Sequence, residues 1–302
     1  MTKFKAWLNA ARLRTLPLSI SGIIIGAALA HLEGYSNMFI FSLAICTTIG
    51  FQVTSNFAND YGDGVKGTDN DDRIGPKRAL QSGILTAEEL KTGIMVSVLV
   101  TLILSLCLLF VAFGKDQIFL MLLFLFLAIA SIWAAIKYTV GNSAYGYRGL
   151  GDIFVFLFFG LLAVLGSMYL FTHYLNYQAL LPAICVGLLS TAVLNLNNLR
   201  DAISDKKAGK NTIVVKIGFE KGKRYHLSLL IIAFLSLLLF TFLNYKSWTN
   251  VVHLLVFILI FTHANRIRKT KNPKDIDPEL KKLALSTFLL AFMFYLSFNY
   301  FL

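Results

Sequence analysis

The sequence predicts an all-α membrane protein built as a bundle of nine transmembrane helices, and three observations support this fold class. Apolar residues make up 57% of the 302 residues and charged residues only 15%, at a mean hydropathy of +0.68. Nine apolar runs are each long enough, at about 17–25 residues, to cross a bilayer as a helix. No long polar segment separates them, so residues 1–302 are expected to form a single domain.

The apolar runs set the expected helix boundaries, which lie at residues 16–33, 39–58, 90–113, 117–137, 152–171, 179–198, 225–244, 248–265 and 283–302. Strands are not expected, because only helices and closed barrels satisfy the backbone within lipid. Pro17 suits a first helical turn, and Thr86 with Glu89 has the spacing of a capping box before the third helix. Asp152 is expected to cap the fifth helix.

The charged residues indicate how the bundle is oriented. All of the 28 Lys and Arg residues except Lys115 and Lys246 lie at one end of the predicted helices, and so do all 16 acidic residues except Glu33 and Asp116. Because Lys and Arg are retained on the cytosolic side, we expect a cytosolic N-terminus, an external C-terminus and the net charge of +12 on the inner face. Such charge attracts anionic lipid, whereas a nucleic-acid partner is not expected without a soluble basic domain.

Several familiar chemistries lack a motif in this sequence. Cys46, Cys107 and Cys185 each lie alone within an apolar run, which favours neither a disulfide framework nor a thiolate metal site. The 5 His residues show no ligand spacing, and no nucleophile elbow, phosphate loop or dinucleotide motif is present. Nucleophilic and nucleotide chemistry is therefore not expected.

Acidic residues are concentrated in one short segment of this apolar chain. The segment NDYGDGVKGTDNDDR, residues 59–73, follows the second apolar run and holds five aspartates. A second polar segment, NNLRDAISDKKAGKNT at residues 197–212, follows the sixth run at the same inner face. An Asp at the centre of a bilayer costs about 2.5–3.5 kcal/mol, so both segments must lie at an interface or in a wet cavity. Their placement indicates a weak internal repeat, in which each half of the bundle contributes one polar helix end.

The spacing within each polar segment points to a divalent cation. Asn59 and Asp63 are four residues apart, as are Asp201 and Asp205, so each pair shares one face of a helix. Two carboxylates about 4 Å apart repel by about 4 kcal/mol at an effective dielectric of about 20, and a cation between them removes that repulsion. Mg²⁺ prefers oxygen ligands and is commonly held by one or two carboxylates with substrate phosphates. A calcium loop of the EF-hand type does not fit, because the Gly and Glu that it requires are missing.

Basic residues around both acid pairs predict a diphosphate substrate, since their side chains are the donors that a diphosphate requires. A diphosphate handled by a membrane enzyme suggests a polyprenyl donor. We interpret Asp69, Asp71 and Asp72 as solvated loop residues that pair with nearby arginines. The basic residues are Lys66, Arg73, Lys77 and Arg78 after the first pair, and Lys206, Lys207 and Lys210 after the second.

A glycine-rich loop, YTVGNSAYGYRGLGD at residues 138–152, offers a place for an aromatic acceptor. Tyr138, Tyr145 and Tyr147 are suited to stacking on a flat ring, and Arg148 is suited to holding a carboxylate. Tyrosines at a membrane interface are equally typical of the aromatic belt. The prenyl tail is expected within the bundle, along LFLFLAIASIW or IFVFLFFGLLAVLG, although lipid-facing helices use the same residues.

These segments together resemble the UbiA-type intramembrane prenyltransferases, and within them the 1,4-dihydroxy-2-naphthoate polyprenyltransferases of menaquinone biosynthesis. The resemblance rests on ARLRTLP at the first helix, NFANDYGDGVKGTDNDDRIGPKRALQSG after the second, GYRGLGDIFVFLFFG opening the fifth and NNLRDAISDKKAGKNT after the sixth. It implies nine helices around a lipid-accessible cavity, with cytosolic cap loops, in the cell (inner) membrane. Gly67 departs from the superfamily pattern, in which an acid is common at this position, and the nearest acid is Asp69.

The resemblance also implies a mechanism and a set of site residues. Mg²⁺ held at Asn59, Asp63, Asp201 and Asp205 stabilises the diphosphate, together with basic side chains, as the allylic C–O bond ionises. The ring of 1,4-dihydroxy-2-naphthoate then attacks at its carboxyl-bearing carbon and loses CO₂, giving demethylmenaquinol. Together with the residue arguments above, the predicted site residues are Asp63, Asp201, Asp205 and Lys66 for catalysis; Lys66, Arg73, Lys77, Arg78 and Lys210 for the diphosphate; and Arg148, Tyr138, Tyr145 and Asn197 for the aromatic acceptor.

Two alternatives remain open at this point. A sister enzyme of the same superfamily would use 4-hydroxybenzoate or haem as the acceptor. A cation or phosphate transporter is a more distant alternative, which is disfavoured because both acid sets lie at one face and no charged residue lies in the middle of a span. No obligate protein partner is evident.

Overall fold

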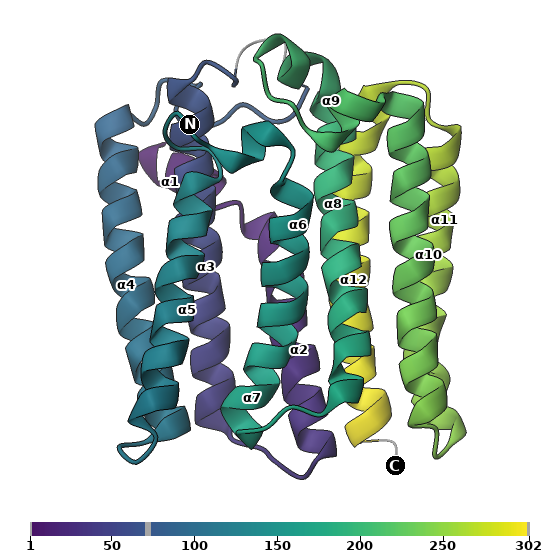
Figure 1. The fold of residues 1–302 in the computed structure, drawn as a ribbon. Coiled ribbons are helices and arrows are strands. Elements are labelled where there is room, and N and C mark those ends of the chain that lie inside the picture. Colours follow the sequence, from purple (N-terminus) through teal and green to yellow (C-terminus); the bar gives the residue numbers. More distant parts are fainter. Residues whose placement is uncertain (1, 70–73, 301–302) are drawn as a thin grey trace.

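The fold is an all-helical membrane bundle, as the sequence predicts (Figure 1). The computed structural model describes residues 2–69 and 74–300, and within these residues there is no β-strand. Nine segments of this described part are long and apolar enough to cross a membrane, which confirms the number predicted from apolar runs. They are Lys3–Leu32, Met38–Val65, Ala87–Phe113, Ile118–Lys137, Gly151–Thr172, Tyr177–Lys207, Phe219–Leu243, Trp248–Lys269 and Pro273–Asn299.

Some spans are single helices and others combine two helix types. The single helices are α3 (Met38–Val65), α4 (Ala87–Phe113), α5 (Ile118–Lys137) and α10 (Phe219–Leu243). The other long helices are α2 (Leu16–Leu32), α8 (Leu180–Lys207), α11 (Val256–Lys269) and α12 (Asp277–Asn299). The short elements at the end of the bundle that carries the N-terminus are α1 (Lys3–Ala11), the 3₁₀ turn η2 (Tyr145–Arg148) and α9 (Ile213–Ile217) (Figure 1).

The two acid-bearing helices extend beyond their predicted ends. The apolar runs end near residues 58 and 198, but α3 continues to Val65 and α8 to Lys207, because a helix that leaves the hydrocarbon needs no apolar residues to keep its backbone bonds. Gly67 and Gly209 then stop the helices with φ of 71° and 73°, in the left-handed region that glycine adopts easily. Each acid pair therefore lies on the last turns of a helix, as its spacing predicts.

The predicted helix starts have mixed outcomes. Pro17 lies in the first turn of α2, and Thr86 and Glu89 form the expected reciprocal capping box at the start of α4. The prediction that Asp152 caps the fifth helix is wrong, because the helix begins one residue earlier, after Leu150. The Asp152 carboxylate instead accepts a hydrogen bond from the Tyr225 hydroxyl at 3.2 Å, which ties the fifth span to α10.

The fifth span lies against α8 at very short range. It consists of α6 (Gly151–Val155), the π-helix η3 (Phe156–Gly166) and α7 (Ser167–Thr172). A Cβ atom at Gly160 would lie 2.5 Å from the Cα of Gly187, so the two backbones approach as closely as glycine permits. π-Helical turns occur often at functional sites, and this one forms a wall of the central cavity.

The helix α5 separates lipid from the interior. Phe126 and Trp133 on its outer face are 66% and 59% exposed, as expected of side chains that contact lipid. Phe124, Leu127 and Ser131 on the opposite face line the cavity. The structure therefore divides the LFLFLAIASIW segment into lipid-facing and cavity-facing residues, which the sequence left undivided.

Candidate active site

The acidic ends of α3 and α8 meet at one end of the bundle, and a lysine lies between them. The Nζ atom of Lys210 is 3.7 Å from Asp63 Oδ2 and 4.0 Å from Asp205 Oδ1. Lys210 follows the Gly209 turn, where its backbone N–H donates to the Asp205 carbonyl at 2.8 Å. All three side chains are buried. The two polar segments that the sequence analysis paired thus share one cation.

The carboxylate of Asp63 has two further partners. The Tyr147 hydroxyl donates to Asp63 Oδ1 at 2.8 Å, and Arg78 Nη2 lies 3.6 Å from Asp63 Oδ2. The same guanidinium lies 3.4 Å from Asp69 Oδ2 through its Nε atom. Asp69 is only 8% exposed, so its pairing with an arginine is confirmed while its expected solvation is wrong. Asp71, Asp72 and Arg73 lie outside the described residues.

Tyr147 connects the loop between the fourth and fifth spans to both polar segments. Its hydroxyl also lies 2.5 Å from the Thr68 hydroxyl, and its backbone carbonyl accepts from Asn211 N–H at 3.0 Å. The ammonium groups of Lys66 and Lys210 lie 4.1 and 5.4 Å from the centre of its ring, within cation–π range. Burial and the neighbouring Asp63 carboxylate raise the pKa of Tyr147, so its hydroxyl remains a donor. From its loop in the sequence, this ring was predicted only to stack on an aromatic acceptor.

Arg200, directly before Asp201 in NNLRD, is a site residue that the sequence did not predict. Its Nε and Nη2 atoms donate to the two oxygens of Asp201 at 2.8 and 2.6 Å. Its Nη1 and Nη2 also donate, both at 2.6 Å, to Asp277 on α12 and to Asn197. Arg200 is 1% exposed, so these acceptors satisfy an otherwise costly buried charge. Its position directly before an acid of the predicted pair was the signal that could have identified it.

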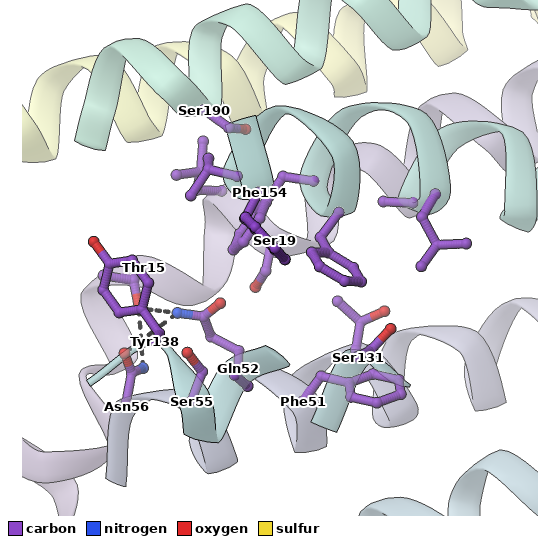
Figure 2. Close-up of a pocket in the computed structure, with 18 of the residues that line it drawn as sticks. Thr15, Ser19, Phe51, Gln52, Ser55, Asn56, Ser131, Tyr138, Phe154 and Ser190 are labelled. Atoms are coloured by element: carbon purple, nitrogen blue, oxygen red, sulfur yellow. Dashed lines mark hydrogen bonds between the residues drawn. The ribbon is translucent and has the colours of Figure 1, made fainter. Parts of the chain in front are cut away.

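A cavity of about 390 Å³ opens beside these charges and extends into the bundle. Asn59, Asp63, Arg78 and Lys210 line its polar end. The remaining wall, from α2, α3, α5, η3 and α8, is mostly apolar with scattered hydroxyl groups, among them Ser19, Ser131 and Ser190 in Figure 2. The cavity reaches Leu109 and Leu170 near the other end of the bundle.

The residues predicted to bind the aromatic acceptor are only partly brought together. Tyr138, Tyr145 and Asn197 line the cavity, and the Tyr138 and Tyr145 rings meet edge to face at 5.3 Å. Burial raises the pKa of Tyr138 to about 12. Arg148 and Lys77 have exposed side chains and do not line the cavity. The structure thus places these two predicted basic residues away from it.

A second polar group on the cavity wall was also missed. Gln52 donates through Nε2 to the Thr15 hydroxyl at 3.1 Å (Figure 2). Asn56 donates through Nδ2 to the Ala11 carbonyl at 2.9 Å. Arg12, which begins the turn between α1 and α2, lines the same cavity with a left-handed backbone at φ 50°. A non-glycine residue in this conformation is uncommon and often marks a functional position. Its place in ARLRTLP was the available signal.

The donor set at the polar end fits Mg²⁺. Asp63 and Asp205 offer carboxylate oxygens and Asn59 offers an amide oxygen, which are the ligands that a hard cation prefers. Within the described ranges, no three carboxylate, imidazole or thiol groups are placed to hold a metal ion by themselves. A site with one or two protein carboxylates is completed by phosphate oxygens in many Mg²⁺ enzymes, so a diphosphate is the expected additional ligand.

Fold and site together define a polytopic membrane protein with charged groups at the mouth of an apolar cavity. The UbiA prenyltransferase family matches residues 19–298, and the chain belongs to this family. It is 43% identical to a 1,4-dihydroxy-2-naphthoate octaprenyltransferase of Haemophilus influenzae, over 97% of this chain and 95% of that protein. The protein of the same name from Escherichia coli is 42% identical over 98% of this chain and 96% of its own length.

The fold is also found among solved structures. A UbiA homologue from Aeropyrum pernix K1 superposes with a TM-score of 0.70 at 14% identity, over 93% of this chain and 97% of that one. A UbiA homologue from Archaeoglobus fulgidus, solved with DMAPP and Mg²⁺, superposes with a TM-score of 0.65 at 14% identity, over 95% of this chain and 99% of that one. At such low identity these structures support the fold alone.

Proposed function

We propose that the protein transfers a polyprenyl group from a polyprenyl diphosphate to 1,4-dihydroxy-2-naphthoate, with loss of diphosphate and CO₂, to form demethylmenaquinol. The observation that carries this proposal is the position of the Asp63–Lys210–Asp205 group at the mouth of a largely apolar cavity. A charged mouth suits a diphosphate, and an apolar interior suits an isoprenoid tail. The two bacterial relatives, matched over nearly their whole length, bear the name of this activity.

In this proposal the charged end of the cavity stabilises the leaving diphosphate. Asn59, Asp63 and Asp205 would hold Mg²⁺ together with phosphate oxygens, and the bound ion would supply Lewis-acid stabilisation of the charge that develops on the diphosphate. Lys210 and Arg78 line the cavity beside it and donate to phosphate oxygens, and Lys66 lies over Tyr147 at its edge.

The second acid helix is held in place by buried ion pairs. Asp201 remains a proposed ligand of the same cation, and Arg200 sets the direction of its two oxygens. Because Arg200 also binds Asp277, the start of α12 fixes this end of α8. Arg73, in the loop after α3, remains a proposed diphosphate contact, and Lys77 remains one only for a diphosphate that extends out of the cavity, because its side chain is exposed and does not line it.

We propose that the acceptor ring lies between the tyrosines and the diphosphate. Tyr138 and Tyr145 line the cavity near Asn197, where a flat ring can stack and its hydroxyl groups can bond the amide. The acceptor also brings a carboxylate, which needs a cation inside the cavity. Arg12 meets this condition better than Arg148, because only Arg12 lines the cavity.

The orientation of the protein in the membrane is part of the proposal. The N-terminus and α9 lie at the same end of the bundle as the acid-bearing ends of α3 and α8, while α12 ends at the opposite end (Figure 1). This end carries nearly all of the Lys and Arg residues, so the positive-inside rule places it in the cytosol. The active site then faces the compartment in which soluble diphosphate is released.

A competition assay tests the proposed acceptor. Purified protein in detergent receives a polyprenyl diphosphate, Mg²⁺ and equal amounts of 1,4-dihydroxy-2-naphthoate and 4-hydroxybenzoate, and mass spectrometry measures the prenylated products. We expect the naphthoate product to dominate. Equal or reversed yields would assign the protein to a sister enzyme, and ion flux into liposomes without any prenyl transfer would replace the enzyme with a transporter.

A further inference from the structure

We propose that Lys210 is an exchangeable internal cation: it holds the carboxylates of Asp63 and Asp205 until a diphosphate draws its ammonium away, so that Mg²⁺ and diphosphate bind as a linked pair. The proposal rests on the proposed function, since it assigns a diphosphate and a divalent cation to this site. It adds a regulation of that site, in which neither ligand binds tightly without the other.

The first observation is the place that the ammonium occupies. Its Nζ atom lies between one oxygen of each acid helix, at 3.7 and 4.0 Å, which is the region that a shared divalent cation needs. A lysine ammonium this close to two carboxylates keeps its positive charge. The side chain therefore carries a permanent charge that repels any cation arriving between the carboxylates.

The second observation is that Lys210 lies farther from its carboxylate partners than Arg200 lies from Asp201. Distances of 3.7 and 4.0 Å exceed those of hydrogen bonds, so electrostatic attraction without a direct bond holds Lys210. Arg200, in contrast, donates two hydrogen bonds of 2.8 and 2.6 Å to Asp201. The arrangement at Asp201 is fixed, and the one at Lys210 can change with little loss.

The third observation is that the cavity leaves space into which the Lys210 ammonium can move. Its side chain lines the cavity, and it follows Gly209, whose left-handed backbone forms a turn rather than a helix. The Tyr147 ring, 5.4 Å away, offers a second favourable surface for the ammonium along the wall of the mouth. Diphosphate oxygens in the mouth would bind the ammonium more strongly than carboxylates beyond hydrogen-bond range, because they bring charge-assisted hydrogen bonds.

Linked binding follows from this exchange. By taking the ammonium, diphosphate removes the positive charge that faces both carboxylates and so favours Mg²⁺ between them. Mg²⁺ in turn raises the affinity for diphosphate by the same factor, because coupling between two ligands is reciprocal. A lysine that only contacts diphosphate predicts a different result. Its removal would lower the affinity for diphosphate and leave the affinity for Mg²⁺, measured without diphosphate, unchanged.

The test measures the affinity for Mg²⁺ by isothermal titration calorimetry on the purified full-length protein, with and without inorganic diphosphate. In the wild type we expect saturating diphosphate to tighten Mg²⁺ binding at least tenfold. In Lys210→Gln we expect Mg²⁺ alone to bind at least tenfold more tightly than to the wild type, with the effect of diphosphate reduced to less than threefold. Lys210→Arg, which keeps the charge, should retain the wild-type coupling.

The matched control is Lys221→Gln, which removes an exposed positive charge near the start of α10 and should leave both affinities unchanged. Mg²⁺ binding to Lys210→Gln that is no tighter than to the wild type, in protein that elutes as the wild type does, would overturn the proposal. So would a wild type in which diphosphate does not change the affinity for Mg²⁺. Because neither measurement uses an acceptor or a prenyl chain, absent prenyl transfer in the wild type would refute the proposed function separately.

Discussion

Replacing Tyr147 with Phe separates two roles for this ring. The substitution removes the hydroxyl that donates to Asp63 at 2.8 Å but keeps the ring that lies 4.1 Å from the Lys66 ammonium. If Tyr147 serves only to stack on an aromatic acceptor, as its loop suggests in sequence, Phe would replace it without loss. If its main role is to hold Asp63, Phe should impair the reaction.

The expected size of the effect follows from the bond that is lost. A hydrogen bond to a charged acceptor contributes about 1.5–3 kcal/mol, and each 1.36 kcal/mol of the barrier changes the rate about tenfold. Arg78 and Lys210 still neutralise Asp63 in the variant, so we expect the lower end of that range, with kcat about tenfold below the wild type. The KM for the acceptor should change less than twofold.

The assay is steady-state prenyl transfer in detergent at several Mg²⁺ concentrations, with Tyr147→Leu as a second variant that also removes the ring. We expect Phe to lower kcat, and Leu to lower it further because the cation–π contacts are lost as well. Wild-type kcat in Tyr147→Phe, together with a raised acceptor KM in Tyr147→Leu, would refute the assignment and support stacking instead.

Three further perturbations test other parts of the account. Asp63→Asn should lower turnover by orders of magnitude. It should also lower the free energy of unfolding by about 1–3 kcal/mol, because two buried cations, Arg78 and Lys210, lose a counter-charge. Chemical denaturation measures this loss, and Asp275→Asn, at an exposed site, is the control that should leave the stability unchanged. Arg12→Gln should raise the acceptor KM more than Arg148→Ala does in the same transfer assay, and the opposite order would restore Arg148 as the carboxylate partner. Single cysteines at Asp275 and Lys246 should react with an impermeant thiol reagent from opposite sides of the membrane, and reaction of both in intact cells would contradict the proposed orientation.

The features that depend on local pattern were predictable from the sequence. Nine spans follow from the lengths of apolar runs, because lipid leaves a helix as the only simple solution for each run. The shared faces of Asn59 with Asp63 and of Asp201 with Asp205 follow from the helical period. That both pairs lie at one end of the bundle follows from the alternation of spans.

The features that depend on packing were not predictable. Lys210 lies between Asp63 and Asp205 only because α3 and the loop after α8 meet in space. The hydrogen bonds from Arg200 to Asp201 likewise depend on side-chain packing at the end of α8. For the same reason the sequence could not distinguish buried Asp69 from a solvated loop residue. Hydropathy measures the preference of each segment for lipid, whereas these pairings depend on which segments are neighbours.

The most direct test of the central claim is the release of CO₂ from carboxyl-labelled 1,4-dihydroxy-2-naphthoate by the purified protein. With a polyprenyl diphosphate and Mg²⁺, we expect one labelled CO₂ for each prenylated product, and neither product when EDTA removes the metal. A prenylated naphthoate that retains its labelled carboxyl group, or no product with this acceptor under conditions in which 4-hydroxybenzoate is prenylated, would contradict the account.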